Sequence, residues 1–267
     1  MSSNDVTEAG TGTGETISLC EVPIDNVTLD EALARIDACI AQGRGGYVTT
    51  PNVDHVCRFH RDERFRNAYR ESFLRLADGM PLLWASRLFG KAIRQKLSGS
   101  DFVYWLAEHA SGKGYPLFLF GAAEGVADAA AAKLRALYPG LLIAGTHSPP
   151  LGFDRDPAAS SDAMRRVKDS GARVCYVALG TPKQELWMQE ASRVPGMPIM
   201  LGIGASLDFI AGRTKRAPVF LQKTGLEWFW RLCMEPRRLW RRYLIDDSYF
   251  LVLLLREARL SWSRRAG

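Results

Sequence analysis

Through its middle, the chain alternates short apolar runs with segments of helical periodicity, and this alternation constrains the fold more than any other feature. The apolar runs have the length of strands and span 116–120, 141–145, 173–179 and 199–203. Helical patterns separate them, at 124–137, 160–170 and 182–192. Strands that alternate with helices favour parallel pairing through crossover helices. We therefore expect an α/β fold with a Rossmann-like, doubly wound, mostly parallel sheet.

The first hundred or so residues continue the same pattern. The expected strands lie at 17–22, 47–50 and 73–77, and the expected helices at 29–40, 55–69 and 101–110. In sheets of this kind, ligands bind outside the carboxyl ends of the strands. The loops that follow the strands are therefore the candidate site, at Thr50, Asp78, Gly121, Gly180 and Gly204.

The pattern changes after residue 222, which predicts a chain of three parts. Residues 1–16 are polar and rich in Gly and Thr, so we expect a disordered tail. Residues 17–222 form the α/β core, and residues 223–267 form a helical appendage rich in Arg and Trp. Within the appendage, the apolar run at 249–255 is far shorter than the roughly 20 residues that span a bilayer.

Positive charge is concentrated at the end of the chain. Residues 213–267 hold 13 Lys and Arg against 5 Asp and Glu, whereas residues 1–212 hold 22 against 24. Four of the seven tryptophans also lie in this last part. A basic, aromatic tail on a nearly neutral body predicts an anionic surface as partner, either phospholipid or nucleic acid. Signatures of nucleic-acid-binding modules are missing, so we expect no nucleic acid and favour the membrane.

The cysteines and the start of the chain both favour the cytoplasm. The five cysteines are scattered and form no cluster at zinc spacing, which is typical of free thiols in a reducing compartment. The first residues lack the basic and apolar regions of a signal peptide. We expect no cofactor, because the GxGxxG fingerprint is absent. Asp154-Arg155-Asp156 matches a D-x-D metal motif, but its place before Pro157 and a helix favours a loop role.

Asp78 is the candidate catalytic residue. It follows an apolar strand and precedes Gly79-Met80-Pro81. A carboxylate at the end of a strand is well placed to act as a general base, because the strand holds it and a cleft raises its pKa. The alternative is a turn aspartate that caps the next helix, since Asp-Gly is a common turn pair.

Two further strand ends carry groups suited to a sugar or a phosphate. Thr50-Pro51-Asn52 offers neutral donors and acceptors, although Pro-Asn is also an ordinary turn. Gly180 leads through Pro182 into a helix that carries Gln184 in its first turn. The free N–H groups at a helix N-terminus favour phosphate, but such residues are also common on any exposed first turn.

The remaining candidates have side chains suited to a nucleoside diphosphate. Asp208 could accept from a uracil N–H, or could be an ordinary cap or surface carboxylate. Arg231, Arg238 and Arg241 recur at spacings of seven and three, which places them on one face if a single helix continues through Pro236. Such a face could neutralise a leaving diphosphate. The alternative is a solvated or lipid-facing basic stripe.

Taken together, these segments resemble the WecG/TagA/CpsF family of glycosyltransferases. The resemblance covers about residues 17–243, and its pieces occur in the family's order. They include Thr50-Pro51-Asn52, Ala77-Asp78-Gly79-Met80-Pro81, Gly99-Ser100-Asp101, Phe120-Gly121, Gly180-Thr181-Pro182-Lys183-Gln184-Glu185, Gly202 to Asp208, Arg216-Ala217-Pro218, Gly225-Leu226-Glu227-Trp228 and Glu235-Pro236-Arg237-Arg238.

The resemblance implies an inverting, metal-independent transfer from a UDP-sugar donor to a sugar on a polyprenyl-diphosphate carrier, in cell-surface polysaccharide or exopolysaccharide biosynthesis. It implies that Asp78 is the base and that Thr50, Asn52 and Gln184 contact sugar or phosphate, beside Gly180. It further implies that Asp208 contacts uracil. The appendage arginines 231, 238 and 241 would neutralise the diphosphate, with the appendage against the inner membrane surface.

Other properties stay open at this point. Glucose, N-acetylmannosamine and its uronic acid are all compatible as the transferred sugar, and the chain could form a homo-oligomer. The resemblance assigns no role to residues 244–267. The rival hypothesis is a non-catalytic protein that binds nucleic acid or membrane through its basic tail.

Overall fold

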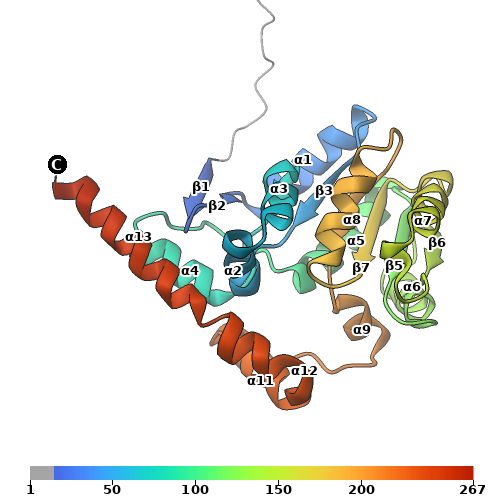
Figure 1. The fold of residues 1–267 in the computed structure, drawn as a ribbon. Coiled ribbons are helices and arrows are strands. Elements are labelled where there is room, and N and C mark those ends of the chain that lie inside the picture. Colours follow the sequence, from blue (N-terminus) through green and yellow to red (C-terminus); the bar gives the residue numbers. More distant parts are fainter. Residues whose placement is uncertain (1–14, 267) are drawn as a thin grey trace, which may run out of the picture.

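The computed structural model describes residues 15–266, except for the side chains of residues 223 and 262–266 (Figure 1). The expected tail at 1–16 therefore falls outside the described residues, apart from its last two. Of these, Thr16 begins a strand. The predicted boundary at 222/223 falls inside a short helix, Val219–Lys223, at the start of the appendage.

Within the described residues, a six-stranded sheet forms the centre of the fold (Figure 1). Its order is β4-β3-β8-β7-β5-β6, and every neighbouring pair is parallel, as predicted. The strands are β3 (Gly46–Thr49), β4 (Leu74–Arg75), β5 (Leu117–Gly121), β6 (Ile143–His147), β7 (Val174–Ala178) and β8 (Ile199–Gly202).

The expected strand at 17–22 is instead a hairpin. Strands β1 (Thr16–Leu19) and β2 (Val22–Asp25) pair antiparallel in a sheet of their own. Cys20 and Glu21 form the turn between them, with φ values of 47° and 62°. Two successive residues with positive φ are typical of the tight hairpin turns that match strand twist. The apolar pattern continues across this turn, which is why it predicted one strand.

Helices occupy the crossovers between the strands. They are α1 (Leu29–Ala41), α2 (Val53–Arg61), α3 (Glu63–Glu71), α4 (Met80–Leu88), α5 (Gly99–Lys113), α6 (Val126–Leu137), η1 (Phe153–Arg155), α7 (Pro157–Asp169), α8 (Lys183–Ser192) and α9 (Ser206–Ala211). The single helix expected at 55–69 is split between α2 and α3. Asp62 leaves the helical conformation there, and its carboxylate accepts from the N–H of Phe65, which starts a new helix.

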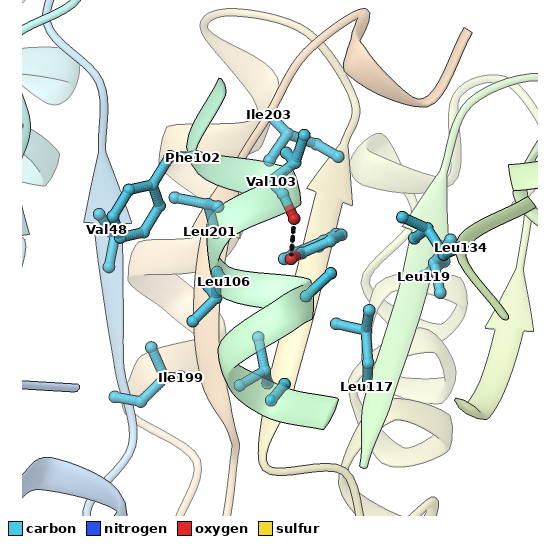
Figure 2. Packing of buried hydrophobic residues seen from close by; sticks show 14 of the residues in the cluster. Val48, Phe102, Val103, Leu106, Leu117, Leu119, Leu134, Ile199, Leu201 and Ile203 are labelled. Carbon is cyan, nitrogen blue, oxygen red and sulfur yellow. Dashed lines mark hydrogen bonds between the residues drawn. The ribbon is translucent and has the colours of Figure 1, made fainter. Parts of the chain in front are cut away.

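Alternate residues of the strands face two different apolar layers. On one face, α1, α5, α6 and α9 cover Val48, Leu117, Leu119, Ile199 and Leu201 (Figure 2). The hydroxyl of Tyr176 donates to the carbonyl of Val103 at 2.6 Å, which ties β7 to α5 (Figure 2). On the other face, α7 and α8 pack on Phe118, Phe120, Cys175 and Val177. Strands buried on both faces explain the continuous apolar runs in the sequence.

A third apolar cluster joins the hairpin, α2, α3 and α4 to the end of the chain. The appendage consists of α10 (Val219–Lys223), α11 (Glu227–Met234), α12 (Pro236–Arg241), the π-helical η2 (Arg242–Asp246) and α13 (Tyr249–Ala266). Phe250 and Leu253 of α13 are buried in this third cluster. Among the described residues, no helix combines the length and apolarity needed to cross a membrane.

Candidate active site

A cleft of about 620 Å³ opens at the carboxyl ends of four adjacent strands, β4, β3, β8 and β7. Its rim is completed by α11, α12, η2 and the start of α13. The lining includes seven of the predicted site residues: Thr50, Asn52, Asp78, Gly180, Gln184, Arg231 and Arg238. Asp208 and Arg241 do not line it, and neither does the predicted loop at Gly121. Gly121 ends β5, which lies beyond β7 in the sheet.

Asp78 lies in the cleft and is not the cap of the following helix. Its backbone N–H donates to the carbonyl of Pro51 at 2.8 Å, which joins two strand ends. Helix α4 begins with Gly79 as its cap, at φ 93°, and makes no side-chain capping bond. The half-buried carboxylate is therefore free to face a ligand. Burial and the nearby Glu227 raise the pKa of Asp78 to about 7, against the lowering effect of Lys96 and Arg231.

Asn52 holds the neighbouring strand end in place. Its side-chain oxygen accepts from the N–H of His55 at 3.1 Å and caps helix α2. Its amide nitrogen remains able to donate to a ligand, since a cap uses the oxygen alone. Thr50 lies against Gly99, where an added Cβ would come within 3.3 Å of the Thr50 hydroxyl. The close approach explains why a small residue begins α5 at this point.

A buried hydrogen-bond chain supports the turn between β7 and α8. The Gln184 amide donates to Glu185 Oε1 at 2.8 Å, and its oxygen accepts from the N–H of Gly204 at 3.0 Å. The hydroxyl of Thr181 donates to the same Glu185 oxygen at 3.3 Å. With its proton used there, Thr181 must accept from His55 Nε2, which lies 2.7 Å away. Gln184 keeps one amide hydrogen for a ligand.

Burial shifts the pKa values of two residues in this hydrogen-bond network, and in both cases it disfavours the charged form. Burial lowers the pKa of His55 to about 3, and burial raises the pKa of Glu185 to about 7. The second ring nitrogen of His55, Nδ1, accepts from the hydroxyl of Tyr69 at 2.7 Å. Neither His55 nor Glu185 was predicted from the sequence. Only tertiary packing brings α2, α3 and α8 together here.

The arginines do not lie on one continuous helix, so the condition under which they would share one face is not met. The chain leaves the helical conformation at Glu235, with φ −134° and ψ 57°, and Pro236 starts a second helix. Proline has no N–H to continue a helix, and its ring clashes with the preceding turn. Arg231 and Arg238 line the cleft, and Arg238 Nε contacts Glu235 Oε2 at 2.5 Å.

Arg242 lines the cleft where Arg241 was expected. Arg241 is exposed at the end of α12, and the π-helical turn that follows changes the rotation per residue. Arg242 Nη2 lies 3.3 Å from Asp54 Oδ2, so this guanidinium is paired with a buried carboxylate of α2. The pair fastens the appendage to the core beside the cleft.

Asp208 lies in the first turn of α9, just outside the cleft. It is half-buried, and burial raises the pKa of its carboxyl. Its backbone carbonyl accepts from the N–H of Arg213 at 2.9 Å. The neighbouring Ser206 and Phe209 line the cleft instead. The rotation of α9 about its axis decides which of its side chains face the cleft. This rotation could not be inferred from the spacing of residues in the sequence.

The D-x-D segment has structural partners. Asp156 caps α7 by accepting from the N–H of Ala158 at 2.9 Å, and Asp154 lies 3.5 Å from Lys183 Nζ. Within residues 15–266, no cluster of His, Cys, Asp and Glu has the arrangement of a metal site.

The cleft is also lined by side chains that were not predicted from the sequence. Lys96, in the loop before α5, contributes a cation close enough to oppose the rise in the Asp78 pKa. Trp228 and Tyr243 line the appendage side, with ring centroids 5.9 Å apart. Aromatic rings of this kind can stack against a base or a sugar face. Lys96 is isolated in the sequence, and no local signal marks it.

A family model described as the glycosyl transferase WecG/TagA/CpsF family matches residues 17–264. The chain belongs to this family. The family match favours a glycosyltransferase over the alternative of a non-catalytic binding protein.

Two curated relatives are similar over most of their length. A protein of Bacillus spizizenii is 29% identical over 216 residues, which is 81% of each chain. A protein of Bacillus subtilis is 28% identical over 244 residues, which is 91% of this chain and 93% of the relative. Both are named N-acetylglucosaminyldiphosphoundecaprenol N-acetyl-beta-D-mannosaminyltransferase.

Two of the segments that resemble this WecG/TagA/CpsF family meet as an ion pair. Arg216 Nη1 lies 2.7 Å from Asp101 Oδ1, and Ser98 donates to the other carboxylate oxygen at 2.6 Å. Arg216 also approaches Glu227 at 3.9 Å. The pair connects the loop before the appendage to α5 and so sets the position of α11 over the cleft.

Proposed function

We propose that this chain transfers an N-acetylmannosamine-type sugar from a UDP-sugar to N-acetylglucosamine on a polyprenyl-diphosphate carrier, without a metal and with inversion. The single observation that carries this proposal is the arrangement of the cleft. A half-buried carboxylate with a raised pKa and several cationic side chains line the same cavity. The names of the two Bacillus proteins favour the sugar and the acceptor.

The mechanism begins with Asp78 in its carboxylate form. Asp78 removes the proton from the acceptor hydroxyl as that oxygen attacks the anomeric carbon of the donor. The bond from the anomeric carbon to the UDP oxygen breaks, and UDP leaves with the electron pair from the opposite face. A single displacement of this kind inverts the anomeric configuration.

The cationic side chains stabilise the charge that develops on UDP. Arg231 and Arg238 reach the cleft from the appendage, and Lys96 reaches it from the core. Fixed cations in a partly desolvated cleft stabilise a leaving diphosphate without the reorganisation that water requires. The Gly180 turn supplies the N-terminus of α8 as a further favourable site for phosphate. Asp208 and Arg241 take no part in this mechanism, because they lie outside the lining.

The direct test is the release of UDP from a panel of UDP-sugars, with N-acetylglucosaminyl-diphosphate-lipid as acceptor. We expect UDP-N-acetylmannosamine to give the fastest release, and we expect the release to require the acceptor and to persist in EDTA. UDP-glucose and the uronic acid donor serve as comparisons. The proposal would be refuted if no donor gave UDP release that depends on the acceptor.

We also propose that the appendage contacts an anionic membrane surface at the inner face of the cell membrane. Exposed arginines, such as Arg237 and Arg241, lie there beside Trp240 and Ile245, which are about half exposed. We expect co-sedimentation with anionic vesicles that falls as salt rises, because salt screens exposed charges. Arg237→Gln with Arg241→Gln should weaken it, whereas Arg135→Gln with Arg155→Gln, on the core, should not. Equal binding to neutral vesicles would count against the proposal.

A further inference from the structure

One side of the cleft is lined by apolar residues that a nucleotide and two sugars would not need. This side is formed by the start of α2, the start of α4 and the end of the chain. Its members are Val53, Met80, Pro81, Leu244, Phe250 and Leu251. Phe250 is also buried in the third apolar cluster, so this wall of the cleft continues into a packed region of the protein.

An exposed apolar row leads out of the cleft along α4. Met80 lines the cleft, and Trp84 and Leu88 follow at intervals of four residues, so all three lie on one face of the helix. Trp84 is 50% exposed and Leu88 is 73% exposed. Over eight residues the row extends about 12 Å from the cleft. Gly225 of the appendage packs on its inner end, where an added Cβ would lie 2.9 Å from Met80 Cβ.

A second row leads out along α13. Leu251 lines the cleft, and Leu255 follows one turn later, with both side chains 64% exposed. The opposite face of α13 packs inward through Phe250 and Leu253. The two helices are fastened beyond the rows, because Lys91 follows α4 and its Nζ lies 2.5 Å from Glu257 Oε1 on α13. Both helices therefore begin at the cleft, because residues of their first turns line it. From there, α4 and α13 run beside each other (Figure 1).

We propose that these two rows, Met80–Trp84–Leu88 and Leu251–Leu255, bind the first isoprene units of the prenyl chain of the acceptor. The inference rests on the proposed function, which places the sugar and diphosphate of the acceptor between Asp78 and the cationic side chains. A ligand with an anionic head in such a cleft and an apolar chain attached to it has to leave along apolar surface. The rows provide that surface from the cleft outward, and they assign a role to Leu251 and Leu255 of α13.

The proposal commits to a prenyl chain rather than to a bilayer surface, because each row starts from a side chain inside the cleft. A surface that only met a bilayer would have no need of apolar residues beside the polar half of the site. A chain bound along the rows would increase the affinity for the acceptor in proportion to the apolar area that it buries. That increase would appear in solution, without any membrane.

The experiment compares the binding of two acceptors by calorimetry, both without detergent and below their micelle concentration. One carries N-acetylglucosaminyl diphosphate on a farnesyl group, and the other carries it on a methyl group. We expect the wild-type chain to bind the farnesyl acceptor at least about 10-fold more tightly. Leu88→Gln with Leu255→Gln should remove most of this preference and leave the affinity for the methyl acceptor unchanged. Both side chains are exposed, so the variant should fold.

Leu137→Gln is the matched control, because Leu137 is 58% exposed and lies on α6, whose packing partners are β5, β6 and α9. It should keep the full preference for the farnesyl acceptor. Equal binding of the two acceptors to the wild-type chain, or an unchanged preference in the double variant, would overturn the proposal. A third outcome would also overturn the proposal. If the two acceptors bind equally and the double variant no longer binds vesicles, the rows contact a bilayer instead.

Sugar transfer is measured in the same samples, so that the two proposals fail separately. A farnesyl preference that disappears in the double variant supports the rows whether or not sugar is transferred. The same preference in a protein that transfers no sugar from any donor would count against the transferase and still support the prenyl site.

Discussion

Replacing Asp78 by Asn is expected to lower kcat by about 10³-fold, with little change in the affinity for UDP. Asparagine has nearly the same shape, but it cannot accept the proton of the acceptor hydroxyl. The capping residue of α4 is Gly79, so the substitution leaves the start of the helix intact. Steady-state UDP release and calorimetric UDP binding measure the two quantities. If this variant kept nearly wild-type turnover, Asp78 would not be the general base.

The pH dependence provides a second readout for the same residue. The base must be ionised, so kcat/KM of the wild-type chain should fall as the pH drops through about 7. In the variant, the residual rate should lose this dependence. The pKa of Asp78 rises from 3.8 in its ordinary environment to about 7, so the folded state holds this proton more tightly than the unfolded state. Its contribution to stability is therefore lost as the pH rises between these values, and Asp78→Asn should remove that loss.

Replacing Arg231 by Gln is expected to lower kcat by roughly 100-fold, because it removes a fixed cation from the path of the leaving diphosphate. Arg231 lines the cleft from α11, and its charge lowers the pKa of Asp78. The variant should therefore also move the pH profile upward. Single-turnover rates with saturating donor would separate this loss in the chemical step from weaker donor binding.

Arg241→Gln is the matched control for Arg231→Gln. Arg241 is exposed and lies outside the cleft, so kcat with a water-soluble acceptor should stay within about two-fold of the wild type. A loss as large as that of Arg231→Gln would mean that the appendage repacks around the bound donor and brings residue 241 into contact with it.

Much of the fold could be predicted from the sequence, because strands buried on both faces leave long apolar runs. The strand at 174–178 and the helix at 29–41 lie within a few residues of their predicted bounds. Predictions failed where a single residue interrupts a continuous pattern. Asp62 splits one expected helix, and the turn at Cys20 divides an expected strand into a hairpin. The restart at Pro236 means that the three arginines do not share the face of a single helix.

The candidate site was predictable only in part. Parallel strands place their carboxyl ends at one edge, so Thr50, Asp78 and Gly180 could be expected to meet without knowledge of the packing. The order of the strands could not be inferred, and it decides that the Gly121 loop lies outside the cleft. Lys96 also had no signal in the sequence, because its role depends on a loop folding back beside a strand end.

By itself, the sequence determined the parallel sheet, the strand-end position of Asp78 and the basic character of the final residues, because these follow from periodicity and composition along the chain. Only the tertiary structure decided which arginines reach the cleft, how His55 and Glu185 support its floor, and where α13 lies against α4. These depend on the rotation of each helix and on contacts between segments far apart in the chain. Local sequence patterns do not indicate the rotation of a helix or its distant contacts, because packing against residues far away in the chain determines both.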